Sequence, residues 1–461
     1  MELFIVLLGG GSGKRLWPLS NDIRSKPFLR LLPGPDGKRE SMIQRICRQL
    51  GQAGMLPFVT MVAHQRQVEI IQHHVGTRVP ILAEPQRRGT FPAVALAASH
   101  LHSRLQVGPD ETVCIMPIDA YVEPNFYACL RQLPEILARS GAELAMIGTV
   151  PHRPSSQYGY IVPAADAGDA QAPYYRVSRF VEKPDEKTAV GLMNEKAFWN
   201  CGVYAFRLSF MLSYLEGKGL PVQYERLLEC YPSFPETSFD EEIAEKTRHA
   251  VVVPYRRTWR DLGDWNTLSD SLGCRIIGPG HLSGDARQTH LINELPHPIH
   301  VIGISNAIVA AGPDGILVAR KDQANRIKEL LDDRQPEPMY VEKRWGTFRV
   351  LDYARTATET LTKKVELLPG KSTSYHLHRR RTEICTILSG FGKFILEGAQ
   401  RSVRPGDVLH IPRGAKHSLK AVHPLEYIVV QIGNALMEED VVRSAMTWEE
   451  AIGKLSAGGK S

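Results

Sequence analysis

A glycine-rich loop follows the first apolar run of the chain and has the residue types that bind phosphate. The apolar run Leu3–Leu8 leads into Gly9-Gly10-Gly11-Ser12-Gly13, and Lys14 and Arg15 then supply two cations. Successive glycines let backbone N–H groups approach an anion closely, and cations offset its charge. It is not a Walker loop, because Leu8 stands where that motif needs its first glycine and Arg15 stands where it needs a serine or threonine. It is not the dinucleotide-binding motif either, because Lys14 stands where that motif needs its third glycine. The sequence therefore predicts another kind of phosphate site, against the plainer interpretation of a glycine-rich turn.

Three histidines and a glutamate in the last quarter of the chain have the spacing of a metal site. His376 and His378 are two residues apart, and Glu383 and His417 follow. Residues two apart in a strand point to the same side, so both histidines can bind one ion while neighbouring strands add the other two ligands. Three imidazoles and a carboxylate suit a divalent transition metal: zinc, manganese, iron, cobalt or nickel. The plainer alternative is a set of surface histidines on a barrel.

Strand and helix patterns alternate in the first half of the chain. The β-rich runs are Phe4–Leu8, Phe58–Ala63, Val79–Ala83, Thr112–Met116 and Leu144–Val150, with helical patterns such as Ser41–Gly51 and Ala93–Leu105 between them. This alternation predicts a Rossmann-like α/β domain whose mostly parallel sheet is covered by helices on both faces. Ligands then bind at the carboxyl ends of the strands.

The pattern changes after about residue 275. Short strands are expected over 300–304, 307–311 and 315–319, then a helix over 322–333 and a proline-rich joint over 334–338. Beyond the joint, short alternating strands separated by glycine and proline predict an all-β barrel or jelly roll. We therefore expect a domain over 1–275, a β-rich connector over 276–335, a jelly roll over 336–440 and a carboxyl-terminal tail over 441–461, of which the last six residues, 456–461, are expected to be loose.

Composition limits the partners and the compartment. The chain has 461 residues, enough for two or three domains. Its 56 Lys+Arg against 50 Asp+Glu are spread along the chain, which argues against nucleic acid as a partner. No segment approaches the roughly 18 apolar residues that span a bilayer, so we expect no membrane partner. The seven cysteines are scattered and lack metal-ligand spacing, which favours a reducing cytoplasm.

The loop and several later strings resemble the sugar-1-phosphate nucleotidyltransferases. The opening string Gly10-Gly11-Ser12-Gly13-Lys14-Arg15-Leu16-Trp17-Pro18-Leu19, followed by Lys26, is similar to the first motif of that family. Further strings follow in the family's order: Glu84-Pro85, Thr90 to Ala97, Pro117-Ile118-Asp119, Tyr158-Gly159-Tyr160-Ile161, Phe180 to Pro184, Trp199 to Gly202 and Trp259 to Trp265. The resemblance is strongest to the mannose-1-phosphate guanylyltransferase branch in its bifunctional form, which is fused to a phosphomannose isomerase.

That resemblance implies a reaction between a nucleoside triphosphate, here GTP, and mannose 1-phosphate, with Mg²⁺ as cofactor. A sugar-phosphate oxygen attacks the α-phosphorus and pyrophosphate leaves, so positioning and charge neutralisation carry the rate. It implies catalytic roles for Arg15 and Lys26 at the triphosphate and for Asp119 and Asp261 as Mg²⁺ ligands. The implied nucleotide-binding residues are Gly9, Gly10, Gly11, Gly13, Lys14 and Glu84. The implied sugar-phosphate residues are Gly159, Glu182, Lys183 and Asn200.

The carboxyl-terminal spacing resembles the two cupin motifs. In the fused isomerase, the metal would polarise sugar oxygens while a base moves a proton between C1 and C2 of mannose 6-phosphate or fructose 6-phosphate. Arg381 matches the isomerase and is a candidate catalytic residue, and Lys364 and the arginines at 379–381 could bind phosphate. The family has other residues at His376, at Arg379-Arg380 and at Ile384-Cys385.

Two alternatives follow from these departures. The family's Arg-Asn-Thr-Ala-Pro is replaced by Arg88-Gly89-Thr90-Phe91-Pro92, and Ser25 replaces a proline, so a transferase for another nucleotide and hexose 1-phosphate is the second interpretation. A third makes the cupin a binding or oligomerising module without catalysis. In each case we expect a homo-oligomer.

Overall fold

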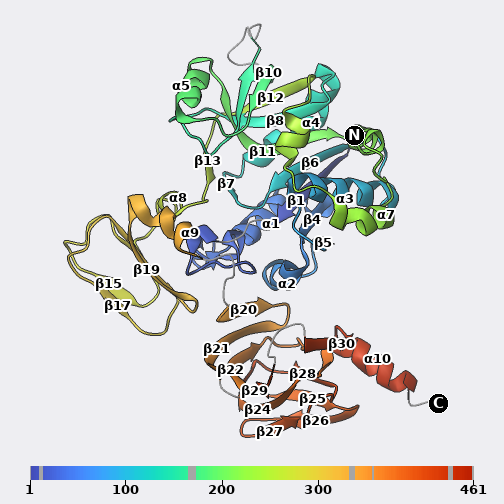
Figure 1. Ribbon diagram of the computed structural model, residues 1–461, viewed down its shortest axis with the longest axis vertical. Coiled ribbons are helices and arrows are strands. Elements are labelled where there is room, and N and C mark those ends of the chain that lie inside the picture. The colour runs from blue at the N-terminus through green and yellow to red at the C-terminus, as the bar shows by residue number, and fades with distance from the viewer. Residues whose placement is uncertain are drawn as a thin grey trace.

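The first half of the molecule is built on one nine-stranded sheet (Figure 1). The computed structural model describes residues 2–9, 14–164, 173–331, 338–355, 358–434 and 440–458. In sheet order the strands are β5 (Ile81–Glu84), β4 (Val59–His64), β1 (Leu3–Gly9), β6 (Thr112–Pro117), β11 (Phe198–Arg207), β8 (Leu144–Thr149), β12 (Ala250–Tyr255), β10 (Tyr175–Val181) and β9 (Tyr160–Pro163). Pairing is parallel from β5 to β6 and between β8 and β12. It is antiparallel around β11, β10 and β9, so the sheet is parallel at one edge and mixed beyond it.

Helices cover both faces of this sheet, as the alternating pattern predicted. In β1, Ile5 and Leu7 face one core and Val6 faces the other, because successive side chains of a strand point to opposite faces. The first core includes α1 (Met42–Gln52), α2 (Val68–Val75) and α4 (Phe126–Ser140). The second includes α3 (Thr90–Ser103), α6 (Leu208–Gly217) and α7 (Tyr224–Cys230). The Rossmann-like α/β class is confirmed.

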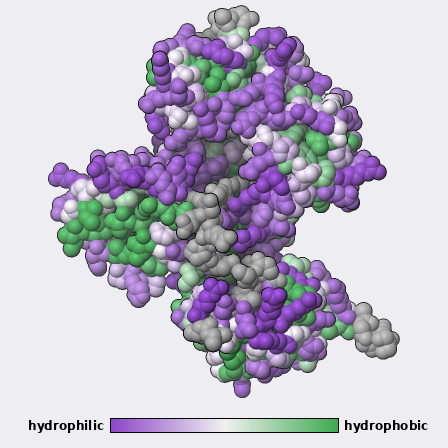
Figure 2. Space-filling view, in the orientation of Figure 1, coloured by the Kyte–Doolittle hydropathy of each residue, from purple (hydrophilic) through white to green (hydrophobic). Residues whose placement is uncertain are grey.

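A small β-rich connector follows the short helix α8 (Trp265–Ser269). One sheet has the order β14 (Ile276–Ile277), β16 (His290–Asn293), β18 (Ala307–Gly312) and β19 (Gly315–Arg320), and β15 (Gly280–Leu282) pairs with β17 (Ile299–Val301). The helix expected over 322–333 is instead a 3₁₀ turn at Lys321–Arg326 followed by α9 (Ile327–Leu330), and Ala324 alone is buried within the turn. Figure 2 shows an apolar area on the viewed side of the connector. The exposed apolar residues of the connector include Ile316 and Val318 of β19.

Two antiparallel sheets form the jelly roll. One has the order β20 (Tyr340–Lys343), β21 (Gly346–Arg355), β22 (Glu359–Leu367), β29 (Leu425–Gly433), β24 (Arg381–Ser389) and β27 (Val408–Ile411). The other has the order β26 (Ala399–Val403), β25 (Gly392–Leu396), β28 (His417–Ala421), β23 (Tyr375–His378) and β30 (Val441–Ala445). Alternate residues of β29 are buried along its whole length, so one face of this strand fills the interior. Most of the proline-rich joint lies outside the described residues.

The segment 441–461, expected as a tail outside the jelly roll, belongs to the jelly roll as far as it is described. β30 pairs with β23, and α10 (Trp448–Gly458) packs Trp448 and Ala451 against Tyr375 and Ile395. The apolar residues Trp448, Ala451 and Ile452 have helical spacing and bury one face, which explains why this segment is ordered.

All seven cysteines lie in the described part of the chain and are free thiols. Within that part, every helix is too short or too polar to cross a membrane.

Candidate functional site

The phosphate loop after β1 is described only at its two ends. Gly9 ends β1, and a Cβ there would lie 3.1 Å from Ala63 Cβ, so glycine lets β1 and β4 pack closely. Gly10, Gly11 and Gly13 lie outside the described residues, as does the side chain of Lys14. Arg15, in the 3₁₀ turn Lys14–Leu16, is exposed. The phosphate nest therefore stays a prediction.

Lys26 lies between the two carboxylates predicted to bind Mg²⁺. Its Nζ is 2.8 Å from Asp119 Oδ2 and 2.7 Å from Asp261 Oδ1. Asp119 stands in the turn between β6 and β7 (Ala120–Val122), and β13 (Trp259–Asp261) pairs with β7 so that Asp261 lies opposite Ala120. Burial lowers the pKa of an ammonium, but the charges of Asp119 and Asp261 outweigh it here and raise the pKa of Lys26.

These two carboxylates fit a hard cation. Their side chains are 37% and 32% exposed, so oxygens of a bound phosphate can reach the same cation. Gly263 leaves room beside one of them, because a Cβ there would lie 2.9 Å from Asp261 Oδ2. The residues present would therefore hold Mg²⁺ together with phosphate oxygens.

Glu84 ends β5 and is buried. The hydroxyl of Tyr231 donates a hydrogen bond to Glu84 Oε1. Burial raises the pKa of Glu84 to about 7, which the hydrogen bond from Tyr231 opposes only in part. Near neutral pH this group therefore exchanges between a carboxylate and a carboxylic acid, with different hydrogen-bonding capacity. Tyr231 has no motif around it and could not be found from one sequence.

The two departures at Gly89 and Phe91 have packing explanations. Gly89 has φ +88, and a Cβ there would lie 2.2 Å from the carbonyl oxygen of Thr237, so only glycine fits beside that backbone. Phe91 is 3% exposed and packs against Tyr214 and Phe234. Both residues shape the start of α3, and this weakens the reason for preferring another nucleotide.

The residues predicted to bind the sugar lie together. Asn200 N donates to the carbonyl oxygen of Gly159 at 2.8 Å. A Cβ on Gly159 would lie 2.5 Å from Glu182 Oε2, so the glycine leaves space above that oxygen. No described residue donates a hydrogen bond to Glu182 Oε2, although the atom is buried. Lys183 contacts Glu182 Oε1 and is itself exposed.

Asp240 joins this group and was missed in the sequence. Its Oδ1 accepts from Asn200 Nδ2 at 2.8 Å and from the hydroxyl of Tyr204. It begins a π-helical turn, Asp240–Ala244, a rare conformation that is frequent at functional sites. Tyr204 and Asp240 accept from Asn200 Nδ2, and the backbone N–H of Gly202 donates to Asn200 Oδ1 at 2.9 Å, so the amide is held in one orientation.

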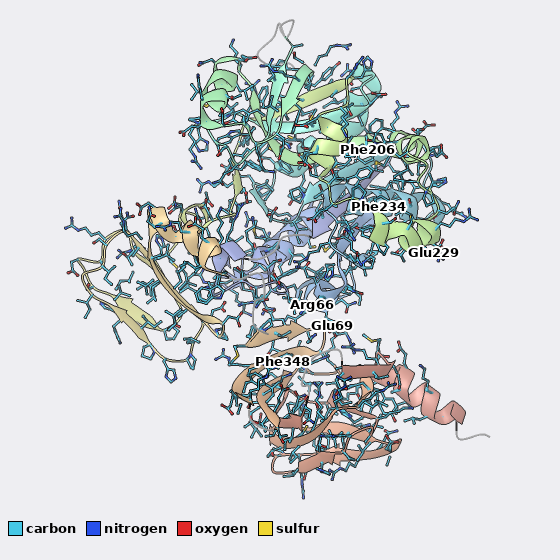
Figure 3. The ribbon with its side chains drawn as sticks, in the orientation of Figure 1. Arg66, Glu69, Phe206, Glu229, Phe234 and Phe348 are labelled. Atoms are coloured by element: carbon cyan, nitrogen blue, oxygen red, sulfur yellow. The ribbon has the colours of Figure 1, made fainter. Side chains whose placement is uncertain are left out.

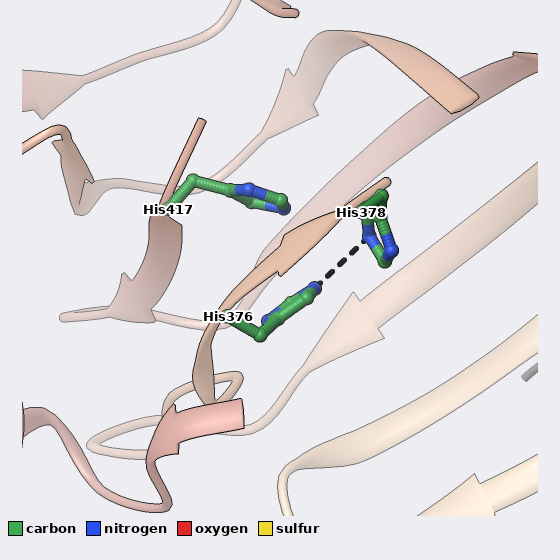
Figure 4. Close-up of side chains that lie close together, drawn as sticks. All are labelled: His376, His378 and His417. Carbon is green, nitrogen blue, oxygen red and sulfur yellow. Dashed lines mark hydrogen bonds between the residues drawn. The ribbon is translucent and has the colours of Figure 1, made fainter. Parts of the chain in front are cut away.

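The four predicted metal ligands of the jelly roll converge. His376 Nε2 is 3.1 Å from His378 Nε2, and the three imidazoles lie side by side (Figure 4). Glu383 Oε1 is 3.1 Å from His378 Nε2, and Glu383 Oε2 is 3.3 Å from His417 Nε2. One ligand atom from each histidine lies within 4.8 Å of the others. The set fits a single divalent transition metal.

Backbone carbonyl groups orient each imidazole. Nδ1 of His376 is 2.8 Å from the oxygen of Ser374, Nδ1 of His378 is 3.2 Å from that of Asp440, and Nδ1 of His417 is 3.1 Å from that of Ala415. A carbonyl can only accept, so Nδ1 carries the proton and Nε2 presents its lone pair to the centre. Burial and the two neighbouring imidazoles lower the pKa of His376 to about 3, which keeps this ligand neutral.

The metal ligands line a cavity of about 600 Å³ that extends from the interior of the jelly roll to Ile23 and Glu69 of the transferase domain. Most of its wall is apolar, and the charged residues Lys363 and Arg381 also line it. Lys364, expected to bind phosphate, instead points out of the barrel and pairs with Glu426. Adjacent residues of a strand face opposite sides of the sheet. Lys363 therefore faces the cavity and can contact a ligand there, whereas its neighbour Lys364 cannot.

The three consecutive arginines at 379–381 also differ in whether they face the cavity or the solvent. Arg381 is 4% exposed, and its Nε lies 3.6 Å from Glu383 Oε1. Arg379 and Arg380 are exposed, and their backbone N–H groups donate to the carboxylate of Asp440. Of the three arginines, only Arg381 reaches the cavity.

Comparison with known proteins agrees with this arrangement. The nucleotidyl transferase family matches residues 5–272, a MannoseP isomerase/GMP-like beta-helix domain matches 287–333, and a cupin domain matches 363–431. The chain is 30% identical to the xanthan biosynthesis protein XanB of Xanthomonas campestris pv. campestris (strain B100), over 97% of this chain and 99% of that protein. It is 29% identical to a mannose-1-phosphate guanylyltransferase of Klebsiella pneumoniae, over 96% of this chain and 98% of that protein.

A solved structure gives the same result for the fold. The crystal structure described as mannose-1-phosphate geranyltransferase from Thermus thermophilus matches with a TM-score of 0.60 and 28% identity, over 72% of this chain and 98% of that chain. The resemblance inferred from the ordered motifs is thereby confirmed. The chain belongs to the nucleotidyl transferase family and carries a beta-helix domain and a cupin domain behind its transferase domain.

Proposed function

We propose that this protein is a mannose-1-phosphate guanylyltransferase, which converts GTP and mannose 1-phosphate into GDP-mannose and pyrophosphate. The observation that carries the proposal is Lys26 between Asp119 and Asp261, at 2.8 and 2.7 Å. Relatives that bear this activity as their name match nearly the whole chain. Residues 1–275 form the transferase in this proposal, and 276–335 connect it to the cupin.

The chain's own groups can position both substrates for in-line attack. In this proposal Lys26 neutralises charge on the triphosphate, and Arg15, at the end of the glycine-rich loop, does the same. Glu84 binds the guanine base of GTP. Gly159, Glu182 and Asn200 bind the mannose ring, and Lys183 binds the phosphate of mannose 1-phosphate. An oxygen of that phosphate then bonds to the α-phosphorus of GTP, and the bond to the β-phosphate breaks. Mg²⁺ held by Asp119 and Asp261 would offset the negative charge on the phosphates.

A second activity is supported by the buried cluster of His376, His378, Glu383 and His417. We propose that the cupin binds a divalent transition metal and interconverts mannose 6-phosphate and fructose 6-phosphate, with Arg381 at the reacting sugar. The competing hypothesis is a transferase for another nucleotide and hexose 1-phosphate with a cupin that only binds. A cytoplasmic location and a homo-oligomer remain predictions.

Pyrophosphate release tests the first proposal. Mannose 1-phosphate and glucose 1-phosphate are each paired with GTP, ATP, UTP and dTTP in the presence of Mg²⁺, using the wild type and Asp261→Ala. We expect turnover with GTP and mannose 1-phosphate that is lost in the variant. Preference for another pair supports the competing hypothesis, and absence of release from every pair overturns nucleotidyl transfer.

A further inference from the structure

A buried cluster of charges joins the transferase domain to the connector and to the first strand of the cupin. Arg24 stands two residues before Lys26 and is 7% exposed. Its Nε donates to Glu342 Oε1 at 3.0 Å, and its two Nη atoms donate to both carboxylate oxygens of Glu294 at 2.7 and 2.9 Å. Glu294 follows β16 of the connector, and Glu342 lies in β20. One guanidinium therefore bridges three parts of the chain.

Glu342 is held from the other side by the transferase domain. Its Oε2 lies 2.9 Å from His74 Nε2 and 3.8 Å from Arg30 Nη2. Burial alone would raise the pKa of Glu342, but His74 and the charges of Arg24 and Arg30 lower it to about 2. Because this carboxylate is 3% exposed, its ion pair with Arg24 is shielded from water and salt.

The loop that carries Arg24 lies between the 3₁₀ turns Lys14–Leu16 and Lys26–Phe28 and is held partly by its own Asn21. Asn21 Oδ1 accepts from the backbone N–H groups of Ile23 and Arg24, at 3.0 and 2.8 Å. Other elements add further contacts: Asn21 Nδ2 donates to Asp314 Oδ2 of the connector at 2.8 Å, and Arg24 pairs with Glu294 and Glu342. The described part of the loop therefore depends both on its own turn and on contacts with the connector and the cupin.

We propose that Arg24 is a positioning residue for Lys26, and that Glu294 of the connector and Glu342 of the cupin hold Arg24 in the place that nucleotidyl transfer needs. The proposal rests on the transferase function proposed above. The Lys26 ammonium must reach two carboxylates on different elements, and its long flexible stem depends on where the backbone of the loop stands. A displacement of 1 Å can lower a rate by about a hundredfold.

A second ion pair crosses the same junction and provides a matched control. Glu69, in α2, faces the cupin, where Phe348 lies (Figure 3). Its Oε2 is 3.0 Å from Lys343 Nζ, the residue next to Glu342. Glu69→Gln therefore removes a charge from the junction without touching Arg24.

The first experiment measures steady-state kinetics of the full chain in wild type, Glu342→Gln, Glu294→Gln, Arg24→Lys and Glu69→Gln. We expect kcat to fall about ten- to a hundredfold in the two glutamine variants of the Arg24 partners, with smaller changes in KM. Arg24→Lys keeps the charge but not the forked geometry, so it should retain part of the activity. Glu69→Gln should keep the wild-type kcat.

The second experiment measures the position of Lys26 without any turnover. Acylation of the substrate-free protein by acetic anhydride, followed by mass spectrometry, reports how accessible each lysine amine is. The Lys26 side chain is 14% exposed and paired with Asp119 and Asp261, so it should react slowly in the wild type. It should react faster in Glu342→Gln and Glu294→Gln but not in Glu69→Gln.

The two experiments separate the inference from the proposed function. Wild-type kcat and wild-type Lys26 acylation in both Glu342→Gln and Glu294→Gln would overturn the inference while leaving the transferase intact. If the wild type releases no pyrophosphate, the proposed function fails. The acylation of Lys26 in the variants then decides by itself whether Arg24 positions Lys26. If Glu342→Gln does not fold, Glu294→Gln decides, because the Glu294 side chain is 23% exposed and its loss is better tolerated.

Discussion

The two candidate sites of this molecule are built in opposite ways. In the transferase site, Lys26, Asp119 and Asp261 come from three separate loops or short strands, and both carboxylates are partly exposed. In the cupin site, three histidines and Glu383 stand on paired strands, are largely buried and face the interior of the jelly roll. An open site built from loops needs other elements to hold those loops, whereas a barrel holds its ligands through strand pairing alone.

This difference predicts different kinds of sensitivity. The transferase site should lose activity when distant contacts such as Arg24 with Glu342 are removed, because the loop depends on contacts with other elements as well as on its own turn at Asn21. The cupin site should lose function mainly when a ligand or cavity residue itself is changed. The variants below test whether the two sites separate in this way.

The largest effect is expected for Lys26→Met in the transferase. Loss of the ammonium leaves the charge that develops on the phosphates without its nearest fixed cation, and kcat should fall on the order of 10² to 10³-fold. Stopped-flow or coupled detection of pyrophosphate measures it. Metal binding by the cupin should be unchanged in the same preparation, and a parallel loss of metal would show that the two sites are not independent.

His378→Ala should produce the converse result. Removing one of three imidazoles should weaken metal binding by about a hundredfold or more, since even changes to outer partners of a ligand cost about 10- to 100-fold. Metal content per chain after dialysis measures this by mass spectrometry. His423→Ala is the control, because His423 is an exposed histidine of the same domain. A transferase kcat equal to wild type in both variants would support the separation.

A smaller effect, in the transferase, is the pH dependence of GTP binding. Burial raises the pKa of Glu84 to about 7, so the group is mostly neutral at pH 6 and mostly ionised at pH 8. If the ionised form accepts hydrogen bonds from the base, GTP affinity should rise by about tenfold across this range. Titration calorimetry measures it, with Glu84→Gln as the control. An equal slope in wild type and Glu84→Gln would assign the dependence to another group.

The smallest effects are expected from a pair of neighbouring lysines in the cupin. Lys363 lines the cavity, so Lys363→Met should weaken mannose 6-phosphate binding by about tenfold, the worth of one charged hydrogen bond. Lys364 pairs with Glu426 on the outside, and Lys364→Met should change binding and stability little. Calorimetry on both variants compares them directly, and equal losses would contradict the assignment of faces.

Much of the fold and of the residue types could be predicted from local pattern. The alternation of Ile5, Val6 and Leu7 between two cores follows from the two-residue period of a strand. The same period places His376 and His378 on one side of β23. Where the pattern is weak, prediction failed: the polar run Lys321–Arg326 forms a 3₁₀ turn, and the segment after 440 closes a sheet instead of forming a tail.

The contacts that join distant segments could not be predicted. No local pattern indicates that Asp240 holds Asn200 or that Tyr231 holds Glu84. Lys363 is different, because it alternates with Leu361 and Val365, which also line the cavity, so the two-residue period of β22 could have indicated it. Contacts between distant segments depend on the packing of whole sheets and not on the nearby sequence.

The amino-acid sequence by itself determined which chemical groups this protein has and the order in which they occur. Spacing within one element is enough for that, because strand and helix periods are local properties of the backbone. Only the tertiary structure decided that Lys26 meets Asp261, 235 residues away, and that Arg24 meets Glu342, 318 residues away. The contacts between loops depend on how the sheets pack against their helices and on which charges can be buried as ion pairs. Both are properties of the whole chain and not of any local segment.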